Sequence, residues 1–384
     1  MDFELNKEQE AIRTAARDFA KGEFDREVAL EHERNHTFPK EIWKKACELG
    51  FIGIHFPEAY GGQDYGILEN ALVVEEFCRQ DSGFGVAVTL ADFASEIILR
   101  FGTEEQKQAY LVPLTEGRMI SCGGFTEPDH GSDITAMNTT AVREGDEWVI
   151  NGTKTFITNG TIGDYVSLLC QTDPDASPTY RGQSVILVER GTPGFTDADV
   201  GEKMGIKMTS TAELSFNNVR VPASNLIGEE NRGFYQVLEF FDESRIEIAA
   251  QALGIAQGAF DRALAYTKER KQFGKKLAQF QATQHKLADM ATKIETARLM
   301  VYKAAWNYDQ GRIDPKLTSM AKMYAARTAV EVADEAIQLH GGYGYMLEYE
   351  VERFYRDAKI MEIYEGTREI QKNTIASSLL GKLK

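Results

Sequence analysis

Apolar residues recur at helical spacing through the first third of the chain. Asn6, with Gln9 three residues later, is a suitable N-cap for a helix whose apolar positions are 12, 15, 16 and 19. The same kind of spacing predicts helices over 39–49, 66–79, 83–101 and 103–116. The sequence PEAYGG at 57–62 predicts a turn between two of them, because proline and paired glycines interrupt helices.

The pattern changes between about 120 and 222, where short runs rich in β-branched and aromatic residues alternate with turn residues. These runs predict strands over 147–152, 165–171, 184–188 and 212–221, and Asn151-Gly152 is a hairpin signal. Such closely spaced strands leave no room for helical crossovers, and no GxGxxG sequence follows a strand. The segment is therefore predicted to be all-β, and a Rossmann domain is not expected.

Helical spacing returns after residue 229 and continues to the end of the chain. Asp314-Pro315 is a good N-cap and first-turn pair for one late helix. The segment 281–309 carries one apolar stripe at steps of three and four residues, formed by Leu287, Met290, Ile294, Ala297 and Val301. The sequence thus predicts an α+β multidomain protein with a helical domain over 1–119, a β-barrel or sandwich domain over 120–228 and a helical bundle over 229–384.

The composition and net charge narrow the kinds of molecule that this protein is expected to bind. The 384 residues carry 59 acids against 43 bases, a net charge of −16, which disfavours nucleic acid or an anionic membrane as the main partner. Charges or glycines interrupt the longer apolar stretches, so no membrane insertion is expected. The acidic opening, MDFELN, shows no secretory or transit peptide and predicts a cytoplasmic protein, or one of an organelle matrix if already processed.

The cysteines and histidines show no metal-binding pattern. Cys47, Cys78, Cys122 and Cys170 lie far apart without a CxxC pair, and the six histidines form no HExxH pair. We therefore expect buried, reduced thiols and neither a disulfide framework nor a metal site.

One carboxylate lies at a predicted helix break near the end of the chain. Glu365 is followed at once by Gly366 and Thr367, within the sequence MEIYEGTREIQ at 361–371. A helix break leaves backbone N–H groups uncommitted, which suits a general base beside a polarised carbonyl. The alternative interpretation is a solvated glutamate in a linker.

Four motifs, in order, resemble those of the flavin-dependent acyl-CoA dehydrogenases. TEPDHGSD at 126–133 resembles the family's TEPxxGSD loop, RKQFG at 270–274 its RxxFG segment, QLHGG at 338–342 its QxxGG segment, and IYEGT at 363–367 completes the set. The match covers essentially the whole chain and is closest to the short-chain, butyryl-type members. It implies a C-terminal four-helix bundle, FAD as cofactor, an acyl-CoA substrate, an electron-transferring flavoprotein as electron acceptor and a homotetramer.

The resemblance also implies two sets of FAD contacts. The first lies around the isoalloxazine ring and the phosphates of FAD and consists of Phe125, Thr126, Gly131, Ser132, Phe156 and Thr158, with Phe156 where tryptophan is most common. The second would reach the FAD of a neighbouring subunit through Arg270, Phe273, Gln338 and Gly342, and Thr367 is assigned to the cofactor as well. An arginine fork suits a pyrophosphate, and glycine permits close backbone approach.

By the same resemblance, Glu365 is the base that removes the α-proton of the substrate. The thioester carbonyl would be held by a flavin ribityl hydroxyl and by the Glu365 backbone N–H, and burial should raise the pKa of this carboxylate. A second subgroup places the base at the position of Ser244, which cannot do this work, and Glu243 should point to another face of the helix. The remaining substrate-side residues are Ser132, Asp242, Arg245, Tyr364 and Gly366.

Asp92 is unexpected in the segment 83–101, which resembles the helix at the bottom of the acyl pocket. It could face solvent or cap a neighbouring helix. Alternatively, it is a second catalytic carboxylate near the distal carbons of the substrate, as in members that oxidise cyclohexane- or cyclohexene-carboxyl-CoA. No arginine that would bind a distal carboxylate is evident there, which counts against a glutaryl-type substrate.

Two other functions remain open from the sequence. An acyl-CoA oxidase-like flavoprotein would let oxygen reach the reduced flavin, although the modest chain length favours a dehydrogenase. A catalytically silent acyl-CoA-binding relative is disfavoured because Glu365, Thr126, Ser132 and Arg270 are all present.

Overall fold

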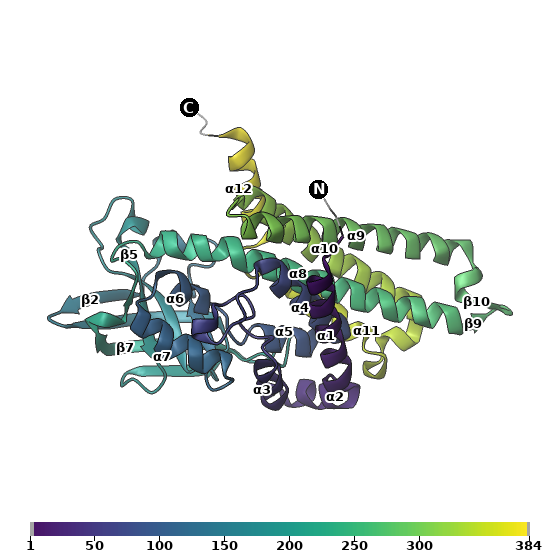
Figure 1. Ribbon diagram of the computed structural model, residues 1–384, viewed down its shortest axis with the longest axis horizontal. Coiled ribbons are helices and arrows are strands. Elements are labelled where there is room, and N and C mark those ends of the chain that lie inside the picture. The colour runs from purple at the N-terminus through teal and green to yellow at the C-terminus, as the bar shows by residue number, and fades with distance from the viewer. Residues whose placement is uncertain (1–3, 382–384) are drawn as a thin grey trace.

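The computed structural model describes residues 4–381, with the large sheet at one end of the molecule and long C-terminal helices extending to the other end (Figure 1). The expectation about the N-terminal leader rests partly on residues 1–3, which lie outside the described part. Asn6 and Gln9 form the predicted capping box of the first helix. The N-terminal helices are α1 (Lys7–Glu23), α2 (Arg26–Asn35), α3 (Lys40–Glu48), α4 (Ile67–Gln80), α5 (Ser82–Thr89), α6 (Ser95–Phe101) and α7 (Glu104–Thr115).

The single helix predicted over 83–101 is wrong, because α5 and α6 are separated by a turn. Ala94 in this turn has a φ of +69°, which a continuous helix cannot contain. Two carbonyls of the turn bond to the sheet domain instead of to the next helical turn: Leu90 O accepts from Asn159 Nδ2 at 2.7 Å, and Ala91 O accepts from Ser121 N at 3.0 Å. Docking against the sheet therefore replaces the helical hydrogen bonds.

The middle of the chain forms an eight-stranded sheet in the order β6-β7-β3-β2-β4-β5-β8, with β1 paired to β4. Most pairs are antiparallel, and β4 pairs in parallel with β1 and with the end of β2. The strands are β1 (Ser121–Gly124), β2 (Thr140–Glu144), β3 (Glu147–Thr158), β4 (Tyr165–Gln171), β5 (Gln183–Glu189), β6 (Phe195–Asp199), β7 (Thr211–Pro222) and β8 (Leu226–Ile227).

The predicted hairpin turn at Asn151-Gly152 is also wrong. Both residues lie inside β3, and the turn between β2 and β3 falls at 145–146, since Glu144 pairs with Glu147. The register of β3 against β7 shifts between Ile150 and Gly152, so the glycine marks a β-bulge. A side chain there would lie 2.5 Å from Thr139 Oγ1, so the glycine permits close strand packing.

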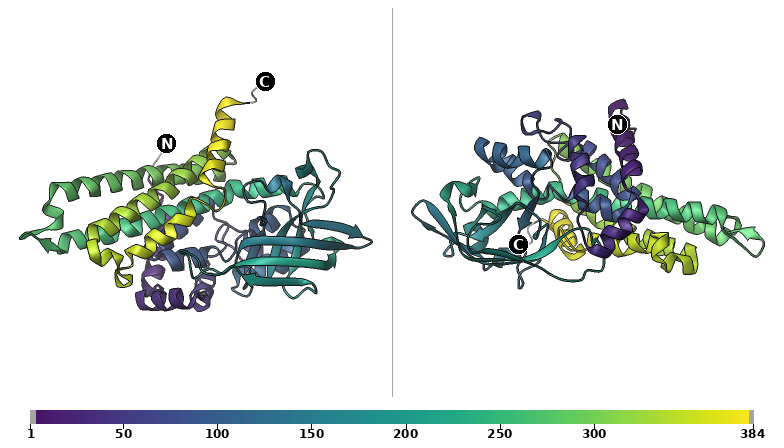
Figure 2. Two further views of the ribbon diagram at one scale, coloured as in Figure 1. Left: turned by 180° about the vertical axis from the view of Figure 1, so that it is seen from behind. Right: turned by 90° about the horizontal axis from the view of Figure 1, so that it is seen from below.

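The C-terminal helices are α8 (Gly233–Glu269), α9 (Gln281–Asp309), α10 (Pro315–His340), α11 (Val351–Met361) and α12 (Arg368–Leu380). The bounds of α9 match the predicted 281–309, and Asp314 caps α10 as predicted. A short hairpin, β9 (Lys271–Gln272) and β10 (Lys275–Lys276), joins α8 to α9. Figures 1 and 2 show this hairpin at the end of the molecule opposite the sheet, with α8 running between the two ends.

Three apolar clusters hold these layers together. One joins α4 to the C-terminal helices, one joins the N-terminal helices to one side of the sheet, and one lies within the sheet domain. All four cysteines are buried and unpaired, as expected. No helix within residues 4–381 is both long and apolar enough to cross a membrane.

Candidate active site

Glu365 lies on a strained turn between α11 and α12. Its φ is +53° and that of Gly366 is +90°, both in the left-handed region that only glycine adopts readily. Within residues 4–381, the backbone N–H groups of Glu365, Gly366 and Thr367 donate no hydrogen bond. The turn therefore offers uncommitted donors beside a carboxylate.

Two buried side chains donate hydrogen bonds to the backbone carbonyls of this turn. Lys322 Nζ, on α10, donates to the carbonyls of Tyr364 at 2.7 Å and Gly366 at 2.8 Å. Gln371 Nε2, on α12, donates to the carbonyls of Glu365 and Gly366, each at 3.0 Å. These hydrogen bonds to the carbonyls of Tyr364, Glu365 and Gly366 offset the backbone strain at Glu365.

The Glu365 carboxylate is partly buried against α8. Ser244 Oγ donates a hydrogen bond to Glu365 Oε2 at 2.7 Å. Burial raises the pKa of Glu365, while the Ser244 hydroxyl and the charges of Arg245 and Lys322 oppose this effect. Burial in turn lowers the pKa of Lys322 to about 7, against the opposing charge of Glu365. A carboxylate whose pKa is raised toward neutrality is suited to take and release a proton.

The neighbours of Ser244 on α8 point in different directions. Glu243 contacts Arg100 and His55, away from Glu365, as predicted. Arg245 is buried, and its guanidinium lies 3.7 Å from the position that a side chain at Gly366 would take. Arg245 thus lies beside the turn. Burial raises the pKa of the nearby Asp242 to about 6, opposed by the charges of Arg245 and Arg100.

Tyr364 links the turn to α8 and α5. Its hydroxyl donates to Gln251 Oε1 at 2.7 Å, and Gln251 Nε2 donates to Thr89 Oγ1 at 3.1 Å and to Glu247 Oε1 at 3.4 Å. Gln251 and Glu247 lie on the same helix as Ser244. Burial raises the pKa of Glu247 well above its usual value, and the negative charges of Asp92 and Glu365 raise it further.

Asp92 is buried in the turn between α5 and α6, with 6% of its surface exposed. The solvent-facing interpretation of Asp92 is therefore wrong. Its Oδ1 atom has no hydrogen-bond partner within the described residues. Burial raises the pKa of Asp92 to about 6, and the charge of His55 is the strongest opposing influence. Asp92 is thus an ionisable group facing the protein interior.

The loop over 126–133 is anchored by a buried ion pair. Lys154 Nζ, on β3, donates to Glu127 Oε1 at 2.9 Å and to Phe125 O at 3.2 Å, and Lys154 is fully buried. The carboxylate of Glu127 also accepts from the N–H groups of Asn138 at 2.6 Å and Thr139 at 2.8 Å. Burial disfavours the charge on Glu127, but Lys154 and these donors hold its pKa below the usual value. The loop is therefore fixed to the sheet.

The groups presented around this loop fit a flavin. Phe156 has a φ of +57°, lies at a register shift of β3 and is 69% exposed. The hydroxyls of Thr126, Ser132 and Thr158 make no hydrogen bond within residues 4–381, and Gly131 is exposed with open space around its Cα. An unpaired aromatic face with hydroxyl donors suits the planar, polar-edged ring of FAD.

The second predicted set of FAD contacts lies far from Glu365 in this chain. Arg270 and Phe273 follow α8, whereas Gln338 and Gly342 end α10, and both groups lie at the tip opposite the sheet (Figure 1). The Arg270 guanidinium lies 5.5 Å from the centre of the Tyr343 ring, and Phe273 is 93% exposed. One chain therefore cannot combine both sets in one site. Thr367, by contrast, caps α12 by accepting from Ile370 N at 3.4 Å.

No sequence motif points to Lys322, Gln251 or Glu247 as parts of the site, and the motif at 126–133 contains Glu127 without assigning it a role. The signal that could have indicated them is a charged or amide residue on an otherwise apolar helix face. Lys322 lies among buried alanines of α10, and Glu247 lies between Ile246 and Ile248. Such residues must find partners when buried: Lys322 finds the carbonyls of the turn at Glu365, and Glu247 finds the side-chain amide of Gln251.

Models of one protein family, and relatives of known name, match this chain over nearly its whole length. Family models for acyl-CoA dehydrogenases match the chain over 6–118 (N-terminal domain), 122–219 (middle domain) and 231–380 (C-terminal domain). The short-chain specific acyl-CoA dehydrogenase of Clostridium acetobutylicum is 45% identical over 380 residues, covering 99% of this chain and 100% of the relative. The NADH-dependent acryloyl-CoA reductase of Anaerotignum propionicum is 44% identical over 382 residues, covering 99% and 96%.

A further relative and two solved structures bear on cofactor and partner. A caffeyl-CoA reductase–Etf complex subunit of Acetobacterium woodii is 40% identical, covering 98% of this chain and 100% of the relative. Butyryl-CoA dehydrogenase from Megasphaera elsdenii superposes with a TM-score of 0.94 at 41% identity, covering 99% and 100%. A glutaryl-CoA dehydrogenase from Mycobacterium smegmatis, solved with FADH2, gives 0.92 at 33% identity, covering 99% and 96%.

Helical domains on either side of a β domain, with a carboxylate at a helix break, define a flavoprotein oxidoreductase that acts on CH–CH groups. The chain belongs to the acyl-CoA dehydrogenase family.

Proposed function

We propose that this protein is an FAD-dependent dehydrogenase of short acyl-CoA thioesters in which Glu365 removes the α-proton. The observation that carries the proposal is the turn at Glu365, where a carboxylate with a raised pKa lies beside backbone N–H groups that donate no hydrogen bond within residues 4–381. A thioester carbonyl accepting from the Glu365 N–H would become polarised, and its α-proton would become more acidic.

The chain's residues divide the work of the reaction. The Phe125–Thr126 segment, Phe156 and Thr158 would hold the flavin, which when bound supplies the acceptor for the β-hydride. Ser244 orients the Glu365 carboxylate, and Lys322 fixes the turn to α10. Arg245 would keep the turn in place and Asp242 would lie toward the pantetheine arm. The product would be the enoyl-CoA.

We further propose that electrons leave through an electron-transferring flavoprotein and that the enzyme is a homotetramer. The relative from an Etf complex supports the first proposal. The two predicted sets of FAD contacts are separated within one chain, which supports the homotetramer. A neighbouring subunit could supply the set around Arg270 and Phe273, at the end of the helical bundle opposite the sheet. An oxidase-like enzyme would instead turn over with oxygen alone, and a silent acyl-CoA-binding relative would bind acyl-CoA without bleaching its flavin.

The buried Asp92 favours a cyclic acyl group over a plain aliphatic chain as one candidate substrate. A buried carboxyl group with one unpartnered oxygen is costly for the fold, whereas a role as a second base near ring carbons would give it a use. Straight short-chain substrates such as butyryl-CoA remain the other candidate, supported by the short-chain specific relative.

Anaerobic bleaching of the bound flavin by a panel of straight, branched, cyclic and dicarboxylic acyl-CoAs tests the proposal. We expect bleaching by butyryl-CoA or by a cyclohexane- or cyclohexene-carboxyl-CoA, and reoxidation by an Etf or an artificial acceptor faster than by oxygen. In an Asp92→Ala variant, we expect bleaching by the cyclic substrate to fall roughly 100-fold or more while that by butyryl-CoA persists. Unchanged rates with both substrates would remove Asp92 from the mechanism.

A further inference from the structure

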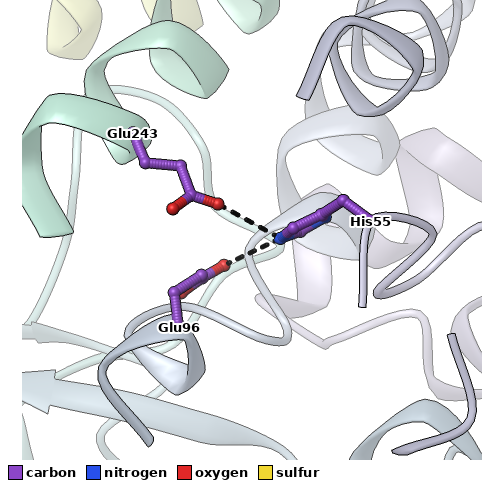
Figure 3. Close-up of side chains that lie close together, drawn as sticks. All are labelled: His55, Glu96 and Glu243. Carbon is purple, nitrogen blue, oxygen red and sulfur yellow. Dashed lines mark ion pairs between the residues drawn. The ribbon is translucent and has the colours of Figure 1, made fainter. Parts of the chain in front are cut away.

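Three buried side chains with metal-ligating atoms meet where the N-terminal helices approach α8. Figure 3 shows His55, from the turn over 52–55, pointing between Glu96 of α6 and Glu243 of α8. His55 Nε2 lies 3.3 Å from Glu243 Oε1 and 3.9 Å from Glu96 Oε1. One ligand atom from each residue lies within 4.8 Å of the other two, so the three are close enough to share one ion.

The separations of these atoms do not suit a hydrogen-bonded ion pair. A protonated histidine bonds to a carboxylate at about 2.7–2.9 Å. Neither ring nitrogen of His55 makes a hydrogen bond within the described residues, although only 5% of its side chain is exposed. In the same part of the chain, Glu96 Oε2 is also buried without a hydrogen-bond partner. Because buried polar atoms are almost always satisfied, these unpartnered atoms indicate a bound group that would satisfy them.

The spacing does suit the ligands of a divalent transition metal. Two atoms bound tetrahedrally to zinc at about 2.0–2.1 Å lie about 3.3 Å apart. His55 Nε2 and Glu243 Oε1 have this separation, 3.3 Å. The Glu96 oxygen lies a little further away and needs only a small side-chain shift to complete the set. The unpartnered Oε2 of Glu96 offers a further contact for the same ion.

The charges of the three residues also favour a divalent cation. Within residues 4–381, Glu96 forms an ion pair with His55 alone, so it has no cationic partner when the histidine is neutral. Glu243 pairs with Arg100 of α6 as well as with His55. Buried carboxylates are costly unless they are paired with a cation or coordinate a metal. Two carboxylates and one neutral imidazole would cancel the charge of a divalent ion and satisfy all three side chains.

Neighbouring side chains hold two of the three residues in position. Glu243 directs Oε1 toward His55. Its Oε2 accepts hydrogen bonds from Arg100 and, at 3.1 Å, from the Tyr308 hydroxyl. The His55 ring packs edge-on against the buried Phe56 ring, with the ring centres 4.7 Å apart. Metal-ligating carboxylates are usually fixed by such hydrogen bonds, so Glu243 and His55 are oriented before an ion binds.

We propose that His55, Glu96 and Glu243 bind one divalent transition-metal ion, for which zinc is the best fit. The mixed imidazole and carboxylate set suits Zn²⁺ better than Mg²⁺, which prefers octahedral oxygen ligands and retains its water. The ion would tie the turn over 52–55 and α6 to α8 and stabilise their packing. Its ligands come from three separate segments, so no spacing in the sequence indicates the site.

The test uses the full-length, FAD-loaded protein after metals have been removed with a chelator and dialysis. Zinc chloride is added, the excess is removed by gel filtration, and bound zinc and Tm are measured by elemental analysis and calorimetry. We expect one zinc ion per chain and a rise in Tm of roughly 3 °C or more, because an ion that binds only the folded protein stabilises it. Magnesium chloride, added in the same way, should give neither result.

Variants of the proposed ligands locate the ion. His55→Gln and Glu96→Gln should each lose the zinc-dependent rise in Tm and bind zinc at least about tenfold more weakly. Glu76→Gln is the matched control, because Glu76 is an equally buried carboxylate that pairs with Arg17, and this variant should keep the zinc and the rise in Tm. Comparing each variant with and without zinc separates metal binding from a general loss of stability.

Wild-type protein that retains no stoichiometric zinc and shows no zinc-dependent rise in Tm would overturn the proposal. Zinc bound equally well by wild type, His55→Gln and Glu96→Gln would also overturn it, because the ion would then lie elsewhere. If neither variant folds, X-ray absorption at the zinc edge of the wild-type protein decides. One imidazole among nitrogen and oxygen ligands at about 2.0–2.2 Å supports the site, whereas a sulfur ligand or a second imidazole excludes it.

Discussion

Lys322 stabilises a backbone conformation that Glu365 would not readily adopt alone. Glu365 has a positive φ without being glycine, which is strained, and the carbonyls on either side of it accept from Lys322 Nζ. The sequence indicates Glu365 through its Gly-Thr neighbours, because a helix break is a local signal. It does not indicate Lys322, because a lysine on a helix is usually exposed and only the packing of α10 against the turn buries it.

Replacing Lys322 with methionine should change both the rate of the reaction and the pH dependence of kcat/KM. The positive charge of Lys322 lowers the pKa of Glu365, so its loss raises that pKa and moves the acidic limb of the kcat/KM profile to higher pH. Two carbonyls also lose their donor, which should destabilise the fold by about 1–3 kcal/mol. Lys303→Met, at an exposed position of α9, should change neither; an unshifted acidic limb in Lys322→Met would contradict this account.

The stability difference between wild type and Lys322→Met should itself depend on pH. The folded pKa of Lys322 is about 7, below the ordinary 10.5, so between these values the unfolded chain binds the extra proton. Wild type therefore gains stability as pH rises through this window, and the variant lacks that gain. Urea unfolding at pH 7 and pH 10 should show a larger difference at the higher pH.

At the scale of elements, the helix and strand patterns identify most segments but not their ends or breaks. The α9 stripe predicts its helix because one face is buried along its whole length. The break between α5 and α6 is not visible in the sequence, because the sheet supplies the hydrogen bonds that end α5. Asn151-Gly152 reads as a turn, yet contacts with β7 and Thr139 make it a bulge. In both cases a partner distant in sequence overrides local preference.

Loss of the buried ion pair between Lys154 and Glu127 should reduce both the stability of the fold and the retention of FAD. Lys154→Met would leave the buried Glu127 charge without its cation, which should cost about 3 kcal/mol and loosen the loop over 126–133. We expect FAD to dissociate more readily, measured as flavin retained after gel filtration. Arg220→Ala is the control, because Arg220 pairs with Glu144 and Glu147 at the exposed edge of the same sheet and should cost about 1 kcal/mol or less. Equal flavin loss in both variants would argue against the anchoring role.

At the scale of the whole molecule, the two predicted flavin-contact sets lie at opposite ends (Figure 2). The sequence motifs suggest both sets, but only the fold shows that one chain cannot join them. The −16 net charge likewise disfavours nucleic acid or an anionic membrane as the main partner without revealing the buried group of His55, Glu96 and Glu243, because charge counts carry no positions.

Replacement of Phe273 tests whether the end of the helical bundle opposite the sheet contacts the FAD of a neighbouring subunit. Phe273 is 93% exposed, so Phe273→Asp should leave the monomer's thermal unfolding almost unchanged. If the tip contacts another subunit's FAD, the variant should lose flavin and shift to smaller oligomers in sedimentation. Val142→Asp, an exposed residue of β2, serves as control. A Phe273→Asp protein that keeps its flavin and wild-type mass would contradict the shared site.

The central claim is that Glu365 is the base of an FAD-dependent acyl-CoA dehydrogenase. The most direct measurement is anaerobic stopped-flow bleaching of the flavin by butyryl-CoA in wild type and in Glu365→Gln, which keeps the size of the side chain. We expect both proteins to bind FAD equally, with bleaching slowed by about 100- to 10,000-fold in the variant. Bleaching of Glu365→Gln at the wild-type rate would show that another group removes the α-proton.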